Sequence, residues 1–430
     1  MSSGTVIELT VERPAVGGRM IARHEGRVVL VGGAIPGERI RAAVERSRRG
    51  VVLARTIEVL TGSLDRRPVA GAAACGGRSF AHIAYRRQLE LKSEIVRDAF
   101  RRLGRIELSV SPRVIPSPET GYRMRARLHV GNGRLGFLEE RSHRVCDVAG
   151  TGQLLPKTER LIGALAAHVG ALASAGVRTV ELAEDLPGDQ CALHVVVGGD
   201  PATVADALRP MASLSGVTGL TATSGTSPGA QLVLAGTPYV TDALTAFVSS
   251  CGVGTASVRR HPASFFQANR YVVPDLVAAV TSLTQRDEVV DLYAGVGLFA
   301  VSIAAIRGGS ITAVERDPGS ARDLVLNAAP LHPAVQVVRA PVEVFLKRSG
   351  GLQGAAVVVD PPRAGLSREV VTRLVRRRPD RIVYVSCDVA TQARDLRALV
   401  DAGYRLDQVQ AFDMFPNTAH IETVVALDRT

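Results

Sequence analysis

Three regions of the chain differ in how their hydrophobic and polar residues alternate. Residues 5–60 contain short β-branched runs separated by glycine turns, among them TVIELTVE, GRMIAR and GVVLARTIEVL. Alternation with a period of two, interrupted by turns, is typical of a small all-β unit. We therefore predict a five-stranded barrel in this region.

The central region, residues 62–255, has a less regular pattern. A helical stretch is expected over residues 85–104 (YRRQLELKSEIVRDAFRRLG), and strands are expected within residues 123–140 (RMRARLHVGNGRLGFLEE). Alanine-rich helices and further strands follow up to about residue 224. This mixture predicts an α+β domain, with glycine- and serine-rich loops near its end.

From residue 256 onward, apolar strands alternate regularly with amphipathic helices. Such alternation predicts a parallel sheet with helices on both faces. The expected strands are 288–293, 310–315, 334–340, 354–360 and 380–387. Two later runs, residues 404–415 and 419–429, are too close for a helical crossover and should form an antiparallel hairpin at a sheet edge. The predicted domains are therefore 1–61, 62–255 and 256–430.

Charge adds a candidate partner to this outline. The 430 residues carry 52 basic and 41 acidic side chains, a formal net charge of +11, which suits a polyanion such as nucleic acid. A solvated basic face would explain any single turn, but the whole barrel region favours a nucleic-acid surface. Its arginines are Arg13, Arg19, Arg23, Arg27, Arg39, Arg41, Arg46, Arg48, Arg49 and Arg55.

Neither a membrane segment nor a secretion signal is predicted. The sequence has no run of eighteen apolar residues, and its N-terminus has no basic region followed by an apolar block. The absence of tryptophan argues against an extended base-stacking platform. We therefore expect a soluble, cytoplasmic protein.

The five cysteines give no spacing typical of a paired or metal-bound set. None forms a CxxC motif, so we predict neither a disulfide framework nor a zinc site, and no metal. They are Cys75, Cys146, Cys191, Cys251 and Cys387. A lone cysteine is more often a small buried hydrophobe than a nucleophile, so Cys387 needs independent support.

The first strand–helix turn of the C-terminal region indicates a cofactor. In DLYAGVGLFA, residues 291–300, Gly295 and Gly297 would let the backbone approach a ligand at the helix start. Glu315 ends the next strand about 20 residues further on, where an acid accepts hydrogen bonds from ribose hydroxyls. A nucleoside-bearing cofactor is favoured, but these features do not separate NAD from S-adenosylmethionine.

Two further strands end in residues of chemical interest. VVVDPPRAGL places Asp360 at the carboxyl end of a buried strand, where open α/β sheets bind ligands. Two prolines then forbid immediate helix formation. The next strand, YVSC, also ends in a reactive residue type, Cys387. Two such strand ends in succession favour a functional role for Asp360 over simple strand termination.

These motifs together resemble the RNA 5-methyluridine methyltransferase family. The resemblance rests on SFFQAN (264–269), DLYAGVGLF, AVERDP, VVDPPRAGL, YVSCDVATQARDL and FDMFPNTAHIETVVALDR, in the family's order. The segment 17–44 resembles part of a TRAM domain, and this resemblance covers roughly residues 5–60, with the turn Ala34–Glu38 as its most specific part. The resemblance implies an OB-like TRAM barrel that binds RNA, a central α+β domain and a C-terminal Rossmann-like, class I methyltransferase domain.

The resemblance also implies roles for individual residues. Carbon 5 of uracil is a poor nucleophile, so Cys387 would add to carbon 6 as a thiolate, which we expect its surroundings to favour. Glu422 matches the base that removes the carbon 5 proton. Arg363 could contact the target nucleotide, which must leave any base stack. Residues matching the S-adenosylmethionine site are Gln267, Tyr293, Gly295, Gly297, Glu315 and Asp360, the last near both substrates.

Two departures from the family pattern affect these expectations. Many members with a TRAM domain bind an iron–sulfur cluster through four cysteines, of which this chain keeps Cys75, with Arg78 and Thr151 at two other positions. We therefore predict no cluster. Asp388 and Val389 replace the usual Asn-Pro after Cys387. Asp388 should disfavour the thiolate unless it points away or pairs with a cation such as Arg394.

Several functions remain open at this stage. The TRAM barrel favours a uridine in 23S ribosomal RNA, with transfer RNA as the alternative target, and we expect a monomer. A catalytically weak RNA-binding relic would keep the same scaffold. A nucleotide-dependent oxidoreductase would use the glycine turn and Glu315, but it leaves Asp360, Cys387 and Glu422 without a role.

Overall fold

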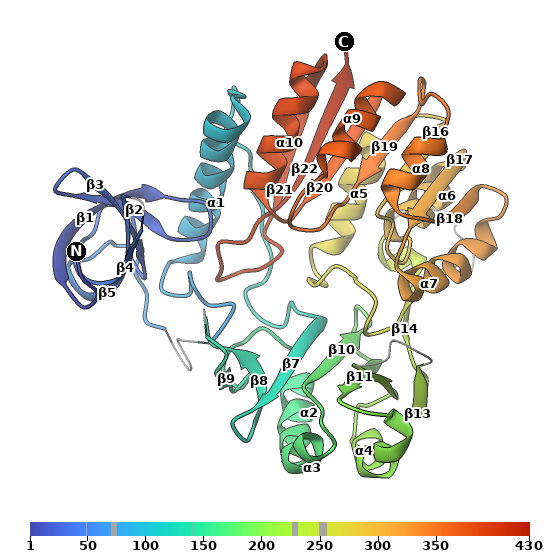
Figure 1. Ribbon diagram of the computed structural model, residues 1–430, viewed down its shortest axis with the longest axis horizontal. Coiled ribbons are helices and arrows are strands. Elements are labelled where there is room, and N and C mark those ends of the chain that lie inside the picture. Colours follow the sequence, from blue (N-terminus) through green and yellow to red (C-terminus); the bar gives the residue numbers. More distant parts are fainter. Residues whose placement is uncertain (49, 70–74, 141, 226–230, 249–255) are drawn as a thin grey trace.

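The computed structural model describes residues 1–48, 50–69, 75–140, 142–225, 231–248 and 256–430. A barrel, a central sheet and a large C-terminal sheet succeed one another along the chain (Figure 1). None of the helices in this described part combines the length and apolar character needed to cross a membrane. Arg49 of the barrel region and Cys251 lie outside the described residues.

The N-terminal strands form the closed five-stranded barrel that the alternation predicted. Ile7, Leu9 and Val11 are buried inside it, while the residues between them are exposed. The strand order is β1-β2-β3-β5-β4. The strands are β1 (Val6–Pro14), β2 (Met20–His24), β3 (Arg27–Gly32), β4 (Arg39–Arg48) and β5 (Val51–Thr61).

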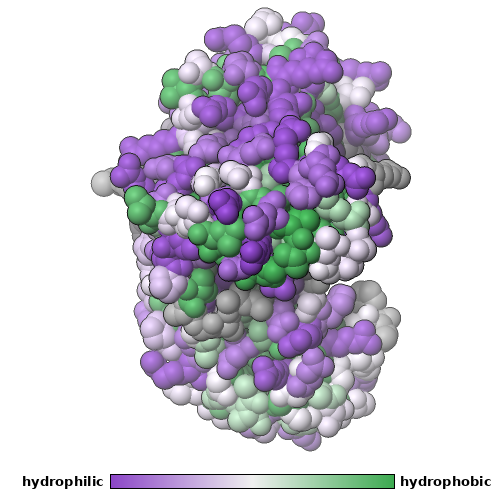
Figure 2. Space-filling view, turned by 90° about the vertical axis from the view of Figure 1, so that its left-hand side faces the viewer, coloured by the Kyte–Doolittle hydropathy of each residue, from purple (hydrophilic) through white to green (hydrophobic). Residues whose placement is uncertain are grey.

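The barrel arginines divide into structural and surface residues. Arg19 is buried, and its guanidinium donates to the carbonyls of Leu30 and Ala54 at 3.0 and 2.7 Å. Hydrophilic residues cover much of the molecular face that carries the barrel, while hydrophobic residues gather near its middle (Figure 2). The exposed arginines of the barrel strands and their turns are Arg23, Arg27, Arg39, Arg41, Arg46, Arg48 and Arg55.

Helix α1 (Tyr85–Ala99), continued by the π-helical turn η1 (Phe100–Gly104), lies between the barrel and the C-terminal sheet (Figure 1). It occupies the predicted helical stretch. Its buried residues include Leu91, Ile95 and Val96, which belong to a hydrophobic core shared by barrel and sheet. This helix therefore connects the two units physically.

The central sheet has seven strands in the order β13-β12-β11-β10-β7-β8-β9 and packs against helices α2 to α4. Its elements are β7 (Arg125–Gly131), β8 (Arg134–Leu138), β9 (Val145–Cys146), α2 (Pro156–Ala166), α3 (Val169–Ser174), β10 (Thr179–Glu184), β11 (Cys191–Val197), η2 (Pro201–Val204), α4 (Ala205–Ala212), β12 (Gly219–Ser224) and β13 (Leu232–Gly236). The small hairpin β14 (Val240–Ala243) and β15 (Ser257–Arg260), with η3 (Leu244–Ala246) between, follows.

The C-terminal sheet has eight strands in the order β18-β17-β16-β19-β20-β22-β21-β6. Its elements are α5 (Val273–Leu283), β16 (Glu288–Leu292), α6 (Leu298–Arg307), β17 (Ser310–Glu315), α7 (Pro318–Ala328), η4 (Ala329–Leu331), β18 (Val335–Arg339), α8 (Val342–Arg348), β19 (Ala356–Val359), α9 (Arg368–Arg377), β20 (Arg381–Ser386), α10 (Val389–Asp401), β21 (Tyr404–Phe412) and β22 (Glu422–Arg429). The five expected parallel strands and the antiparallel hairpin are all present.

One expectation about this sheet is wrong in detail. The hairpin does not end the sheet, because β6 (Val114–Ile115) pairs in parallel with β21 and is the outermost strand. A two-residue strand leaves no periodic signal in the sequence. Both α1 and β6 therefore pack with the C-terminal sheet although they precede residue 256, and the domain boundaries themselves stay a prediction.

Candidate active site

Four predicted site residues lie at the carboxyl ends of neighbouring strands in the C-terminal sheet. Leu292 of β16 pairs with Val359 of β19, and Val359 pairs with Tyr384 of β20, all in parallel register. Tyr293, Asp360 and Cys387 therefore follow the carboxyl ends of neighbouring strands, and Glu315 ends β17. In the strand order, β17 lies on one side of β16 and β19 lies on the other. Open α/β sheets bind ligands at such a switch point.

The turn after β16 has the backbone of a cofactor loop. Tyr293, Gly295 and Gly297 all have positive φ, of 64°, 57° and 93°. A side chain at Gly297 would collide with Leu324. The Glu315 carboxylate accepts hydrogen bonds from the backbone N–H groups of Gly295 and Asp317, at 2.8 and 2.6 Å. The loop and the acid predicted from spacing are thus fixed against each other.

A buried carboxyl lies beneath this turn. Asp291 is fully buried, and one of its oxygens accepts from the backbone N–H of Ala300 at 3.1 Å. The other oxygen has no hydrogen-bond partner among the described residues. Burial first, and then the charge of Asp360, raise the pKa of Asp291 to about 8. An orphaned buried acceptor beside a glycine turn fits a site that receives a polar ligand.

Asp360 and Gln267 meet at the switch point. The side-chain amide of Gln267 donates to Asp360 at 3.3 Å, which brings the SFFQAN segment onto the sheet edge. Asp360 is only partly exposed, and burial raises its pKa to about 7. The two predicted cofactor contacts therefore lie together, at the strand end next to β20.

Cys387 and Glu422 approach each other because β20 and β22 are antiparallel. Ser386 pairs with Thr423, so Cys387, which follows Ser386, lies beside Glu422, which precedes Thr423. Glu422 is buried, and burial together with the Asp360 charge raises its pKa. Burial first, and then the Glu422 charge, raise the pKa of the Cys387 thiol to about 11, against an opposing effect of Arg363.

This electrostatic environment corrects one expectation. We expected surroundings that favour the thiolate of Cys387, but only Arg363 acts in that direction. Burial and two carboxylates outweigh it, because a charged sulfur loses solvation and is repelled by like charge. The pKa of Cys387 is therefore raised above the usual range of a thiol, and the site disfavours its thiolate.

A pocket of about 210 Å³ opens onto Cys387. All three parts of the chain contribute to its wall. The lining residues are Val16 and Gly17 of the barrel, Gly77, Ser79 and Ile95 before and within α1, Glu140 of the central domain, and Arg363, Cys387, Asp388, Val389, Thr418, Ala419, His420 and Ile421 of the C-terminal domain. Arg363, suggested from sequence as a nucleotide contact, thus shares a pocket with the candidate nucleophile.

Asp388 does not act on Cys387 as the sequence suggested it could. Its side chain accepts hydrogen bonds from the backbone N–H groups of Ala390 and Thr391, at 3.1 and 2.9 Å, and so caps the N-terminus of α10. Arg394, the suggested partner, instead forms an ion pair with Asp395. An aspartate is a favourable N-cap, which explains its place there without a catalytic role.

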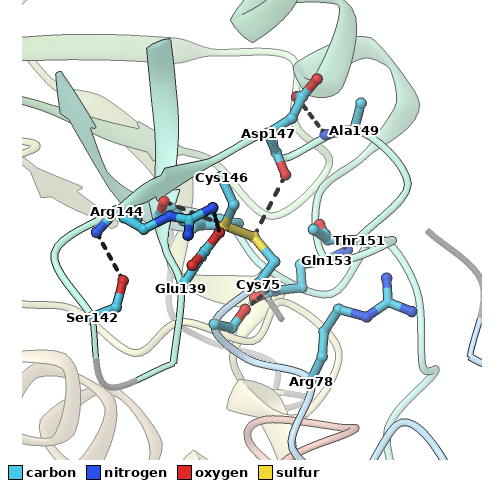
Figure 3. The surroundings of a disulfide bond; sticks show 12 residues. Cys75, Arg78, Glu139, Ser142, Arg144, Cys146, Asp147, Ala149, Thr151 and Gln153 are labelled. Carbon is cyan, nitrogen blue, oxygen red and sulfur yellow. Dashed lines mark hydrogen bonds and ion pairs between the residues drawn. A yellow bond between two sulfur atoms is a disulfide. The ribbon is translucent and has the colours of Figure 1, made fainter. Parts of the chain in front are cut away.

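The predicted absence of a disulfide is wrong, because the structure joins Cys75 to Cys146 (Figure 3). The two residues are 71 positions apart, and tertiary contacts bring them together. Cys75 forms an isolated antiparallel β-bridge with Glu139, and Cys146 pairs with Phe137 of the neighbouring strand. Arg78 and Thr151 lie nearby, as Figure 3 shows.

These surroundings do not fit an iron–sulfur cluster. A cluster of the kind found in the family needs four thiolate ligands, whereas Cys75 and Cys146 are joined to each other in a disulfide. Cys191 is buried in the central sheet. No group of three or more histidine, cysteine or acidic side chains in the described ranges could hold a metal ion.

Most of the pocket wall was missed from sequence, and three residues illustrate why. Val16 and Gly17 lie in the turn between β1 and β2, and His420 is exposed at the pocket, edge-to-face with Phe415 at 5.9 Å. A glycine pair signals a turn, but nothing in it says that the turn reaches a site nearly 400 residues later. His420 directly precedes Ile421 and Glu422, and this proximity was the only available signal.

Comparisons with known proteins agree with this geometry. The family described as tRNA (Uracil-5-)-methyltransferase matches residues 348–430, and the TRAM domain matches residues 2–57. A 23S rRNA (uracil(1939)-C(5))-methyltransferase of Halomonas elongata is 32% identical over 98% of this chain and 89% of its own. An uncharacterized RNA methyltransferase of Streptomyces coelicolor is 31% identical over 99% of this chain and 93% of its own.

Among solved structures, the Pyrococcus abyssi tRNA (uracil-54, C5)-methyltransferase in complex with S-adenosyl-L-homocysteine matches 97% of this chain and 100% of its own. The TM-score is 0.69 at 24% identity, which establishes the shared fold. Barrel, sheet order and site therefore define a class I, S-adenosylmethionine-dependent methyltransferase with a TRAM domain. The chain belongs to the RNA uracil-5 methyltransferase family, and its substrate is RNA. The oxidoreductase alternative is excluded.

Proposed function

We propose that the protein methylates carbon 5 of a uridine in 23S ribosomal RNA through a covalent adduct with Cys387. The observation that carries the proposal is the pocket in which Cys387 and Arg363 meet, with Glu422 beside the thiol. The full-length similarity to a 23S rRNA methyltransferase supports the ribosomal target over transfer RNA. We further propose that the protein acts as a monomer.

The reaction requires a nucleophile, a base and an electrophile around one uracil ring. Cys387 loses its proton to solvent, and its Sγ atom then forms a bond to carbon 6, which places electron density on carbon 5 as an enolate. The Arg363 guanidinium stabilises the thiolate that this attack requires. The bound cofactor supplies the electrophilic methyl group. Glu422 then accepts the carbon 5 proton, and the sulfur leaves carbon 6 with its electron pair.

The proposed cofactor residues fit S-adenosylmethionine. Glu315 would receive the ribose hydroxyls, and the glycine turn gives the cofactor close access to the backbone. Gln267, Tyr293 and Asp360 would hold the end of the cofactor that faces Cys387. The polar acceptor left open on Asp291 lies under the same turn.

We propose that the enzyme works without an iron–sulfur cluster. The joined Cys75 and Cys146, with Arg78 and Thr151 beside them, support this. Stoichiometric iron and acid-labile sulfide in anaerobically purified protein would refute it.

The test is transfer of tritium from methyl-labelled S-adenosylmethionine to undermethylated total RNA, followed by nucleoside analysis of size-separated RNA. Wild type should label 5-methyluridine in large ribosomal RNA, and Cys387→Ala should give no label. Glu422→Gln should leave methylated RNA attached to protein on a denaturing gel, because the carbon 5 proton stays. Glu369→Gln on the exposed face of α9 is the matched control. Label in transfer RNA would overturn the target, and label with Cys387→Ala would overturn the mechanism.

A further inference from the structure

The loop between β21 and β22, residues 413–421, forms one wall of the Cys387 pocket; we call it the pocket loop. It extends from the end of the sheet toward α1 (Figure 1). Its residues Thr418, Ala419, His420 and Ile421 line the pocket, and Glu422 follows directly. The position of this loop therefore shapes the pocket wall that faces Cys387.

The start of the pocket loop is held by buried polar contacts. Lys92 of α1 is fully buried, pairs with the Asp413 carboxylate and donates to the carbonyl of Phe415 at 3.1 Å. The side-chain amide of Asn269 donates to the carbonyls of Asp413 and Met414, at 3.4 and 3.2 Å. These partners come from α1 and the SFFQAN segment, outside the hairpin that carries the loop.

Asn417 is the centre of a second set of contacts. Its backbone N–H donates to the side-chain oxygen of Gln88 at 2.9 Å, and its carbonyl accepts from the N–H of Phe80 at 2.8 Å. Its side-chain oxygen accepts from Arg67 at 2.7 Å and from Gln88 at 3.0 Å. Four hydrogen bonds therefore tie one residue of the pocket loop to α1 and to the segment that precedes it.

The backbone at Asn417 explains why an asparagine is suited to this place. Its φ of 65° lies in the left-handed region, which asparagine tolerates better than most residues other than glycine. Glycine would allow the same backbone but would lack the oxygen that Arg67 and Gln88 donate to. Asparagine supplies both the turn and the acceptor.

We propose that Asn417 is a positioning residue that fixes the pocket loop for catalysis. It is not among the residues that line the pocket, and it acts through Thr418 to Ile421, which do. The inference rests on the proposed function, because it assigns the loop to the pocket in which the uridine reacts. Its partners Arg67, Phe80 and Gln88 thereby support the active site from the N-terminal half of the chain.

The test compares Asn417→Gly with Asn417→Asp. Glycine keeps the backbone and removes the acceptor, so kcat should fall by about 10- to 100-fold as the loop loses its fixed geometry. Aspartate keeps an acceptor oxygen for Arg67 and should stay within about threefold of wild type. The KM for RNA and the affinity for S-adenosylmethionine should change by less than about threefold in both, because Asn417 is not among the residues that line the pocket.

The matched control is Asn132→Gly. Asn132 is also an asparagine with positive φ, 52°, but it is exposed between β7 and β8 and is not among the pocket residues. Its replacement should leave kcat unchanged. Should Asn417→Gly fail to fold, Gln88→Met removes both side-chain hydrogen bonds to Asn417 and should give the same loss of kcat.

Amide hydrogen exchange separates this inference from the function on which it rests. Residues 418–421 should exchange faster in Asn417→Gly than in wild type, and at the wild-type rate in Asn417→Asp. Unchanged exchange and unchanged kcat in Asn417→Gly would overturn the positioning role. If wild type methylates no RNA while exchange in the pocket loop increases as expected, the proposed function fails and the positioning role stands.

Discussion

At the scale of single residues, the site contains charges that oppose its own nucleophile. Glu422 and Asp360 both raise the pKa of Cys387, and each is itself harder to ionise because it is buried. Arg363 acts in the opposite direction and lowers the pKa of Cys387. A thiol with a raised pKa forms little thiolate, so adventitious reaction of Cys387 should be slow.

This arrangement predicts a pH dependence for adduct formation. Cys387, with a pKa of about 11, must lose its proton before it can attack carbon 6. The thiolate fraction rises with pH, so kcat/KM should increase between pH 6.5 and 9, by up to about tenfold per unit. Single-turnover rates at subsaturating RNA would measure this. A rate that is flat or falls over that range would contradict it.

At the scale of elements, each reactive residue is placed by the end of a strand or the start of a helix. The carbonyl of Arg363 accepts from the Thr391 hydroxyl at 3.1 Å, so the first turn of α10 also holds the loop after Asp360. Asp395 accepts from the N–H of Leu366 at 2.7 Å, further along that loop. Helix α10 thus orients both Cys387, directly before it, and the Arg363 loop.

The N-cap of α10 can be tested by stability. Asp388→Ala should lower the free energy of unfolding by about 1 kcal/mol, because two backbone N–H groups lose their acceptor. Asp388→Asn should retain nearly all of it, since asparagine caps as well as aspartate. Ser367→Ala, which removes the cap of α9, is the comparison and should cost a similar amount. Urea unfolding would measure all three. Full stability of Asp388→Ala beside a destabilised Ser367→Ala would show that Asp388 is not a cap.

At the scale of the whole molecule, parts far apart in the sequence build one pocket. The β1–β2 turn, the segment before α1 and the pocket loop meet there, and a side chain at Gly18 would collide with Ala419. The Cys75–Cys146 disulfide lies next to this junction. Gly77, two residues after Cys75, lines the pocket. RNA held by the barrel would therefore lie close to the reacting cysteine.

The disulfide should contribute measurably to stability. A disulfide between residues 71 positions apart limits the conformations of the unfolded chain. It should therefore raise the free energy of unfolding by about 4 kcal/mol. Unfolding in urea should therefore shift to lower concentration when a reductant is added. The double variant Cys75→Ser with Cys146→Ser should unfold alike with and without reductant. Peptide mapping under non-reducing conditions should recover the linked peptides, and their absence from fully oxidised protein would contradict the link.

Sequence reasoning succeeded where a local pattern carries the information. Alternation predicted the barrel, and strand spacing predicted the sheet and placed Asp360 and Cys387 at the carboxyl ends of two of its strands. It failed where tertiary contacts decide. The pairing of Cys75 with Cys146, the two-residue strand β6, and the contacts of Asn417 with Arg67 and Gln88 join segments whose separation leaves no periodic trace. The net electrostatics of Cys387 likewise depend on burial, which spacing does not reveal.

The central claim is that Cys387 forms the covalent bond to the target uridine, and it can be tested by trapping that bond. RNA containing 5-fluorouridine should be attacked and methylated normally, but its carbon 5 has no proton for Glu422 to remove. The enzyme should therefore stay attached to the RNA. Mass spectrometry of the digested complex should then find a nucleotide on the peptide that contains Cys387, with Cys191 unmodified. An attached nucleotide on another residue, or methylation of uridine RNA with no trapped complex, would contradict the account.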